Sequence, residues 1–317
     1  MTAWFSPYTL VPRAELNARS GSRPRNGALL RIGSGFADLH PWPELGDLPL
    51  EAHLASIAAG RPTSLARRSL DCAAADGQAR ELGVSLFEGL PIPPSHYPAG
   101  AGELPDFRFL ERAGFDRVKM KAGADAGADL ARLTAAAPSL LGTPIRLRID
   151  FNSSLTLAEL GEMLAAMTPQ LLARIDFLED PVPPEAATWN EIRRRWGVRL
   201  AADREKLDPS SWDIAVIKPA WEPAGAAASA LEMGKPLVFT SAMDHPIGQL
   251  WAAWNAAVAQ KDHPGRVLAC GLLSHGVYEA NEFSDRLEAE GAVLLPPDRT
   301  GLGFDDLLEA LEWKRLT

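Results

Sequence analysis

Three short stretches decide the fold: Arg117–Lys121 (RVKMK), Ile145–Asp150 (IRLRID) and Ile175–Glu179 (IDFLE). Each is a short β-rich run followed by an amphipathic helical stretch, which is typical of βαβ units with a parallel sheet. Working outward, the same alternation predicts further strands over His96–Pro98, Arg199–Asp203, Ile214–Lys218, Leu237–Ser241 and Val267–Gly271. Eight strands spaced about 15 to 30 residues apart favour a barrel of the (β/α) type over an open doubly wound sheet.

Helices are expected between the strands, for example over Leu155–Met167, Glu185–Trp196 and Ile247–Gln260. Residues 1–95 show a different pattern, with a strand over Gly27–Ile32 and helical patterns near Leu50–Ala59 and Ser64–Leu82. Loops rich in Gly, Ser, Arg or Pro separate these elements, at Asn17–Asn26 and His40–Pro49. The tail, 301–317, carries a last helix that we expect to pack on the N-terminal region. The sequence therefore predicts two domains, one over 1–95 plus about 300–317 and one over 96–299.

Composition excludes several classes of protein. The 317 residues are 46% hydrophobic and 23% charged, as in an ordinary globular protein with a substantial core. A net charge of -9 gives no basic face for a nucleic acid, and no apolar run approaches the roughly 20 residues of a membrane span. Two cysteines, Cys72 and Cys270, form no disulfide framework and read as small buried hydrophobes. With no signal peptide visible, we expect a cytoplasmic protein.

Charged residues end five successive predicted strands. Strand interiors are otherwise apolar, so these charges lie where burial is costly unless they are paired or bind a metal. In a barrel of this kind the carboxyl ends of the strands carry the chemistry. The residues concerned are Lys119, Lys121, Asp150, Glu179, Asp203 and Lys218.

Lys119 and Lys121 are two apart, so both side chains of this strand project to one face. Two neighbouring ammonium groups lower the pKa of at least one of them, and a neutral lysine can act as a base. The alternative for this pair is a solvated edge strand.

Asp150, Glu179 and Asp203 end neighbouring strands and are expected to converge at the barrel mouth. Three carboxylates suit Mg²⁺, with Mn²⁺ as a possible substitute, although each acid taken singly is an ordinary helix cap or loop residue. Asn152, two residues past Asp150, is expected to support that ligand or shape the turn.

Together the motifs resemble those of the enolase superfamily, and its muconate-lactonizing subgroup in particular. The stretches that carry the resemblance are VKMK (118–121), RIDFN (148–152), FLEDP (177–181), Ala202-Asp203 and VIKP (216–219). Within the subgroup, the Ile-Lys-Pro ending and the compact length are most similar to the o-succinylbenzoate synthase family.

The resemblance implies a (β/α)7β modified TIM barrel beneath an α+β capping domain. It implies Mg²⁺ on the three carboxylates, Lys121 as the proton-abstracting base with Lys119 beside it, and Lys218 on the opposite face of the substrate. The implied activity is that of a hydro-lyase in menaquinone biosynthesis acting on a small carboxylate. Two stretches depart from the family pattern: Arg204 precedes Glu205 where Glu is common after the third ligand, and Thr240–Met243 is poor in Ser and Gly.

For substrate binding we expect contributions from the seventh and eighth strand ends and from the capping loops. The residues selected are Ser241, Asn152, Gly271, Arg23 and Arg25, with Arg19 in the same loop. The arginines would meet a substrate carboxylate, and their alternative is a flexible solvated loop.

Two other functions remain open at this point. An N-acyl amino acid racemase or dipeptide epimerase on the same scaffold would use Lys121 and Lys218 as two bases on opposite faces. A non-catalytic barrel that binds a metal or an acidic ligand is the more distant alternative, because such a module needs no neutral amine. The sequence makes no prediction about the oligomeric state.

Overall fold

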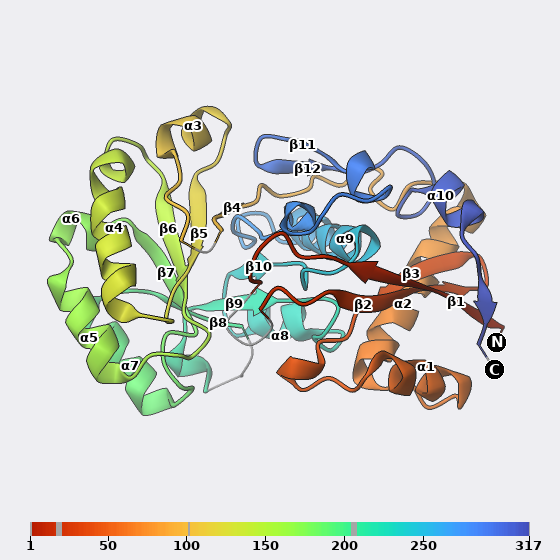
Figure 1. The fold of residues 1–317 in the computed structure, drawn as a ribbon, viewed down its shortest axis with the longest axis horizontal. Coiled ribbons are helices and arrows are strands. Elements are labelled where there is room, and N and C mark those ends of the chain that lie inside the picture. The colour runs from red at the N-terminus through yellow and green to blue at the C-terminus, as the bar shows by residue number, and fades with distance from the viewer. Residues whose placement is uncertain (1, 17–20, 101, 204–207, 317) are drawn as a thin grey trace.

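Two sheets carry the fold of the computed structural model, which describes residues 2–16, 21–100, 102–203 and 208–316. Figure 1 shows the antiparallel sheet with α1 and α2 at one end of the molecule and the parallel strands with their helices at the other. Both chain ends lie at the outer side of the antiparallel sheet. No helix in these ranges is long and apolar enough to cross a membrane.

The antiparallel sheet has the order β13-β1-β2-β3. Its strands are β1 (Ala3–Leu10), β2 (Arg25–Ile32), β3 (Gly35–Leu39) and β13 (Lys314–Arg315), and its helices are α1 (Leu50–Ala58) and α2 (Ser64–Leu82). The predicted strand and both predicted helices are confirmed. The predictions omitted β1, which contains a proline that argues against a strand, and β3, which has only five residues.

The tail returns to this sheet, as expected. Helix α10 (Asp305–Ala310) is followed by β13, which pairs antiparallel with β1 through Trp4 and Arg315. The predicted domain limits at residues 95 and about 300 remain a prediction.

The parallel sheet has the order β10-β9-β8-β7-β6-β5-β4. Its strands are β4 (Tyr97–Pro98), β5 (Arg117–Lys121), β6 (Arg146–Asp150), β7 (Ile175–Glu179), β8 (Leu200–Ala202), β9 (Ile214–Ile217) and β10 (Leu237–Phe239). Its helices are α3 (Phe107–Arg112), α4 (Ala126–Leu141), α5 (Leu157–Ala166), α6 (Pro169–Leu172), α7 (Ala186–Trp196), α8 (Ala226–Glu232) and α9 (Pro246–Asp262). Short 3₁₀ turns and one hairpin complete the described chain: η1 (Pro43–Leu45), η2 (Pro209–Ser211), η3 (His275–Val277), η4 (Ser284–Arg286), β11 (Glu288–Glu290) and β12 (Val293–Leu295).

The eighth predicted strand is only partly formed. Residues 267–271 make isolated bridges rather than a continuous strand. Their backbone is nevertheless bonded on both sides, from Leu268 N to Leu237 O at 2.8 Å and from Cys270 N to Pro94 O at 2.7 Å. This segment closes the barrel between β10 and the residues before β4, which confirms the predicted fold class.

Local signals in the sequence explain where the helices begin. Thr156 and Glu159 form a capping box at the start of α5, and Thr63 accepts a hydrogen bond from Ala66 N at the start of α2. Strand β7 is buried along its whole length, as is typical of a parallel strand covered on both faces, and its acids Asp176 and Glu179 are ion-paired. These elements hold the strand ends in fixed positions around a cavity.

Candidate active site

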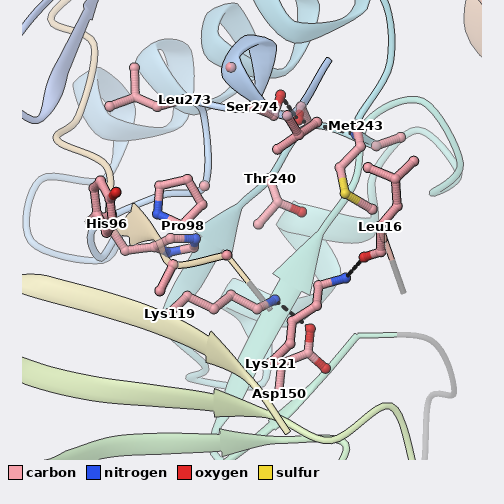
Figure 2. A pocket seen from close by; sticks show the side chains of 18 of the residues that line it. Leu16, His96, Pro98, Lys119, Lys121, Asp150, Thr240, Met243, Leu273 and Ser274 are labelled. Carbon is pink, nitrogen blue, oxygen red and sulfur yellow. Dashed lines mark hydrogen bonds and ion pairs between the residues drawn. The ribbon is translucent and has the colours of Figure 1, made fainter. Parts of the chain in front are cut away.

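A cavity of about 530 Å³ lies at the carboxyl ends of the parallel strands and extends to residues 13–16 of the antiparallel domain. Figure 2 shows Lys119, Lys121 and Asp150 at its floor, His96 and Pro98 on one wall, and Leu16 and Met243 on the opposite wall. The predicted site residues that line it are Lys119, Lys121, Asp150, Asn152, Asp203, Lys218, Ser241 and Gly271. Thus the structure brings most of the predicted site together.

The ammonium group of Lys119 forms ion pairs with two of the carboxylates. Its ammonium lies 2.9 Å from Asp150 Oδ2 and 2.7 Å from Glu179 Oε1. Burial alone would lower the pKa of Lys119, but the carboxylates of Asp150, Glu179 and Asp203 outweigh it and raise that pKa well above its usual range. The ammonium form of Lys119 is therefore strongly favoured in this arrangement.

Lys121 projects from the same strand face but is held differently. Its Nζ donates a hydrogen bond to the backbone carbonyl of Leu16. Burial lowers the pKa of Lys121, and the positive charges of Lys119 and Lys218 lower it further, against an opposing effect of Asp150. The paired lysines therefore behave as two ammonium groups on one strand face should, with one charge favoured and the other disfavoured.

The three acids sit on neighbouring strand ends. Asp150 and Glu179 are register partners on β6 and β7, and Asp203 directly follows β8. Although burial opposes ionisation, Lys119 and Lys121 lower the pKa of Asp150 to about 2. Burial raises the pKa of Glu179.

As the side chains stand in the described ranges, no three acids, histidines or cysteines converge on one point that would hold a metal ion. The acids point instead to ammonium groups, those of Lys119 and Lys218. The donor set nevertheless fits a hard divalent cation, because it offers carboxylate oxygens from three adjacent strand ends and no soft ligand. Binding requires these carboxylates to rotate from the lysines to the ion.

Lys218 follows β9, across the sheet from β5, and its Nζ is paired with Asp203 Oδ2. The same ammonium lies 5.3 Å from the centre of the Trp221 ring. Lys121 and Lys218 thus reach the cavity from different strands. Their position on opposite faces of a substrate stays a prediction.

The remaining predicted wall residues have definite partners. The Ser241 hydroxyl lies 2.6 Å from that of Ser274, which donates to Gln249 Oε1 at 3.3 Å. Asn152 has a left-handed backbone with φ of 50°, and its N–H donates to Asp150 Oδ1 at 3.2 Å. Asn152 therefore orients a predicted metal ligand through its backbone.

The structure does not place Arg23 or Arg25 among the residues that line the cavity. Arg25 is buried, stacks over Trp42 at 4.0 Å and donates to both oxygens of Glu44. Its charge is therefore used within the antiparallel domain, which corrects the expectation that it meets the substrate. Arg19, Arg204 and Glu205 lie outside the described residues.

The lining side chains that sequence reasoning missed include Arg13, His96 and Trp221. Arg13 reaches it from the segment after β1, with Nε donating to the carbonyl of Tyr278. His96 precedes the first barrel strand, and this position was the only signal that pointed to it. His245 caps α9, with Nδ1 accepting from Ile247 N at 3.3 Å.

Comparison with known proteins identifies the family. Residues 3–79 match the family model described as O-succinylbenzoate synthase, N-terminal domain, and residues 107–215 match Enolase C-terminal domain-like. The chain is 33% identical to the o-succinylbenzoate synthase of Bdellovibrio bacteriovorus, over 98% of both chains. The chain belongs to the o-succinylbenzoate synthase family. This confirms the resemblance to the enolase superfamily and the predicted enzyme class, a hydro-lyase.

Solved structures support the fold of this family member. The o-succinylbenzoate synthase of Thermosynechococcus elongatus BP-1, solved with Mg in the active site, has a TM-score of 0.66 at 19% identity, covering 88% of this chain and 95% of that one. A dipeptide epimerase from Enterococcus faecalis, complexed with Mg and a dipeptide, has a TM-score of 0.76 at 16% identity, covering 95% and 98%. At these identities the likeness shows a shared fold and does not choose between the two activities.

Proposed function

We propose that the protein is a Mg²⁺-dependent o-succinylbenzoate synthase of menaquinone biosynthesis. It would convert 2-succinyl-6-hydroxy-2,4-cyclohexadiene-1-carboxylate, a small carboxylate, into o-succinylbenzoate with loss of water. The observation that carries the proposal within this family is the pair on β5. One lysine is held positive by carboxylates and the other, with a lowered pKa, faces the same cavity.

Lys121 is assigned as the base. As a neutral amine, its Nζ takes the proton from the carbon next to the substrate carboxylate, and the electron pair of that C–H bond forms the enediolate. The hydroxyl at the β carbon then leaves with the proton that Lys121 carries, so water departs and the ring becomes aromatic. One lysine on one face of the substrate is sufficient for both steps.

Asp150, Glu179 and Asp203 are assigned as the residues that hold the metal. When bound, Mg²⁺ supplies Lewis-acid stabilisation of the negative charge that develops on the substrate carboxylate. Lys119, freed from those acids, places a second positive charge beside that carboxylate. Ser241 and Gly271 are assigned to the substrate-binding wall.

Lys218 is assigned as a cation rather than a base in this reaction. It approaches from the side opposite Lys121 and lies near the Trp221 ring, in a setting that suits a charge placed over a substrate ring. Such a contact contributes roughly 2 kcal/mol when it is desolvated.

The same opposition of Lys121 and Lys218 favours a second candidate, an N-acyl amino acid racemase or dipeptide epimerase, in which both lysines are bases. A substrate panel with Mg²⁺ separates the two. We expect o-succinylbenzoate formation, followed by ultraviolet absorbance, at a kcat of about 1–10³ s⁻¹. Efficient epimerisation of a dipeptide or N-acyl amino acid, with dehydration slower by orders of magnitude, would replace the proposal with the alternative.

A further inference from the structure

His96 is a buried side chain that the mechanism above does not use. Its ring lines the cavity while the residue is only 5% exposed, and its backbone N–H donates to Cys270 O at 2.7 Å. Figure 2 shows it on the wall beside Lys119. The residue directly precedes β4, the first barrel strand. His96 is therefore held in place at the wall of the cavity.

The hydrogen bond with Arg148 determines which nitrogen of the His96 ring carries the proton. Nδ1 of His96 lies 3.1 Å from Nη1 of Arg148. A guanidinium has donors and no acceptor, so Nδ1 must accept this bond, and the ring proton must be on Nε2. Burial, with the charges of Arg148 and Lys119, holds the pKa of His96 well below its usual range, so the ring is neutral.

Arg148 is itself rigidly held. It is 1% exposed, donates from Nε to Asp176 Oδ2 at 2.9 Å, and stacks over the Phe177 ring at 4.7 Å. Its Nη1 also donates to the carbonyl of Ala269 at 2.5 Å. The guanidinium therefore cannot turn away to release the ring.

The other edge of the ring, with Cε1 and Nε2, lies next to the backbone of Gly271. A Cβ at Gly271 would lie 2.9 Å from His96 Cε1 and 3.1 Å from Nε2, so only glycine fits against this histidine. Within the part of the chain that the structure describes, Nδ1 and the backbone N–H of His96 are hydrogen-bonded, and Nε2 has no protein acceptor. The neutral Nε2–H donor beside the cavity has no acceptor in the described part of the protein, so it is available to bind a ligand.

We infer that His96 is a substrate-binding residue whose Nε2–H donates a hydrogen bond to a carbonyl or carboxylate oxygen of the substrate. The inference rests on the proposed function and adds a specificity element to it. Because the donor is fixed and lies near the positive Lys119, it favours an acceptor oxygen over the ammonium or N–H of an amino-acid derivative. The contact therefore orients a carbonyl or carboxylate oxygen of the substrate at this wall of the cavity.

Two variants test this contact. His96→Phe keeps an aromatic ring and removes the donor, whereas His96→Gln retains an N–H donor at a similar reach. With Mg²⁺ present, we expect His96→Phe to raise KM and the Kd of o-succinylbenzoate by about 5- to 10-fold, the size of one lost hydrogen bond. The kcat should change less, and His96→Gln should recover most of the loss. Melting temperatures of both variants serve as the folding control.

A spectroscopic measurement on the wild-type enzyme keeps the inference testable even where a variant does not fold. In ¹⁵N-histidine-labelled protein, the His96 signals should show a neutral ring protonated at Nε2 between pH 6 and 8, and product should shift the Nε2–H resonance. A proton on Nδ1, or an Nε2–H resonance that product leaves unmoved, would overturn the inference.

The outcomes separate the inference from the function on which it rests. Normal dehydration by the wild type together with unchanged KM and product Kd in a folded His96→Phe variant overturns the inference alone. Absence of dehydration by the wild type overturns the proposed function and the inference together. Equal weakening in both variants would identify His96 as a packing residue and also overturn the inference.

Discussion

The lysines of the cavity differ in what holds each ammonium group. Lys119 faces two carboxylates and Lys218 faces one, whereas Lys121 donates to a neutral backbone carbonyl. A carboxylate stabilises the charged form of a lysine much more than a carbonyl does, because it carries a full negative charge. This difference of partner, rather than the residue type, is the reason for proposing Lys121 as the base.

Lys121→Ala should abolish exchange of the α-proton of the substrate with D₂O, with a loss of about 10²–10⁴-fold or more, because the acceptor of that proton is gone. Lys218→Ala should slow turnover yet keep exchange, since Lys121 remains. Exchange is measured by proton NMR in the presence of Mg²⁺. Stereospecific loss of exchange on one face in each variant would show two bases and contradict the single-base assignment.

At the scale of elements, the parallel register determines which side chains meet. Cα partners across β5, β6 and β7 place Lys121 beside Asp150 and Asp150 beside Glu179. The carboxyl ends of these strands therefore deliver lysines and acids to one rim of the barrel. Helix α9 also supports the cavity wall, because its Gln249 accepts a hydrogen bond from Ser274, which lines the cavity.

Mg²⁺ should raise the melting temperature of the wild type, because it binds the folded state and not the unfolded chain. At a Mg²⁺ concentration one hundred times its Kd, the melting temperature should rise by about 5 °C. Asp150→Asn should remove this Mg²⁺-dependent shift, as measured by calorimetry with and without EDTA. The exposed acid Asp306, which pairs with Arg286, provides the control: Asp306→Asn should keep the shift. An unchanged shift in Asp150→Asn would exclude that residue as a ligand.

The packing of β3 on α2 predicts a second effect at this scale. A Cβ at Gly35 would lie 1.8 Å from the backbone oxygen of Ala73, which cannot move without displacing the helix. Gly35→Ala should therefore lower the free energy of unfolding by about 2 kcal/mol or more in denaturant titrations. Gly276→Ala, where a Cβ meets nothing within 4 Å, should leave stability nearly unchanged. Equal stability of the two variants would show that β3 can move away from the helix.

At the scale of the whole molecule, a buried carboxyl pair joins the antiparallel domain to the barrel. Asp38 on β3 accepts hydrogen bonds from Tyr8 Oη at 2.5 Å and from His245 N at 3.0 Å. A Cβ at Gly248 would lie 2.5 Å from Asp244 Oδ2 and 2.7 Å from Asp38 Oδ2, so both acids border the same point. Burial raises the pKa of Asp38 to about 7, and burial together with Asp38 raises that of Asp244 well above its usual range.

These raised pKa values predict how stability depends on pH. Between about pH 4 and pH 7 the folded state binds more protons at this pair than the unfolded state does, so stability falls as the pH rises. Asp244→Asn removes one of the two acids and should flatten this fall. At pH 8 its melting temperature should exceed that of the wild type by about 1–2 °C, the shift expected for 1 kcal/mol in a chain of this length. Parallel melting curves from pH 5 to 8 for both proteins would contradict this account of the pair.

The sequence by itself determined the repeating part of the protein. Alternating β-rich and amphipathic stretches are local patterns, so seven strands of the barrel and most of its helices follow from them. The charged residues at the strand ends followed as well, because a parallel barrel places every carboxyl end on one rim, and Lys119, Asp150 and Glu179 do meet there.

Only the tertiary structure determined which residues far apart in the chain contact each other. Arg25 is bound by Glu44, the tail strand β13 pairs with β1, and residues 267–271 close the barrel through isolated bridges. The tautomer of His96 depends on Arg148, which lies 52 residues away in the sequence. Local pattern specifies which side chains a strand can present. Which partner neutralises a charge, or which ring nitrogen carries a proton, is set by contacts between distant segments, because electrostatic and hydrogen-bond energies depend on distances in space.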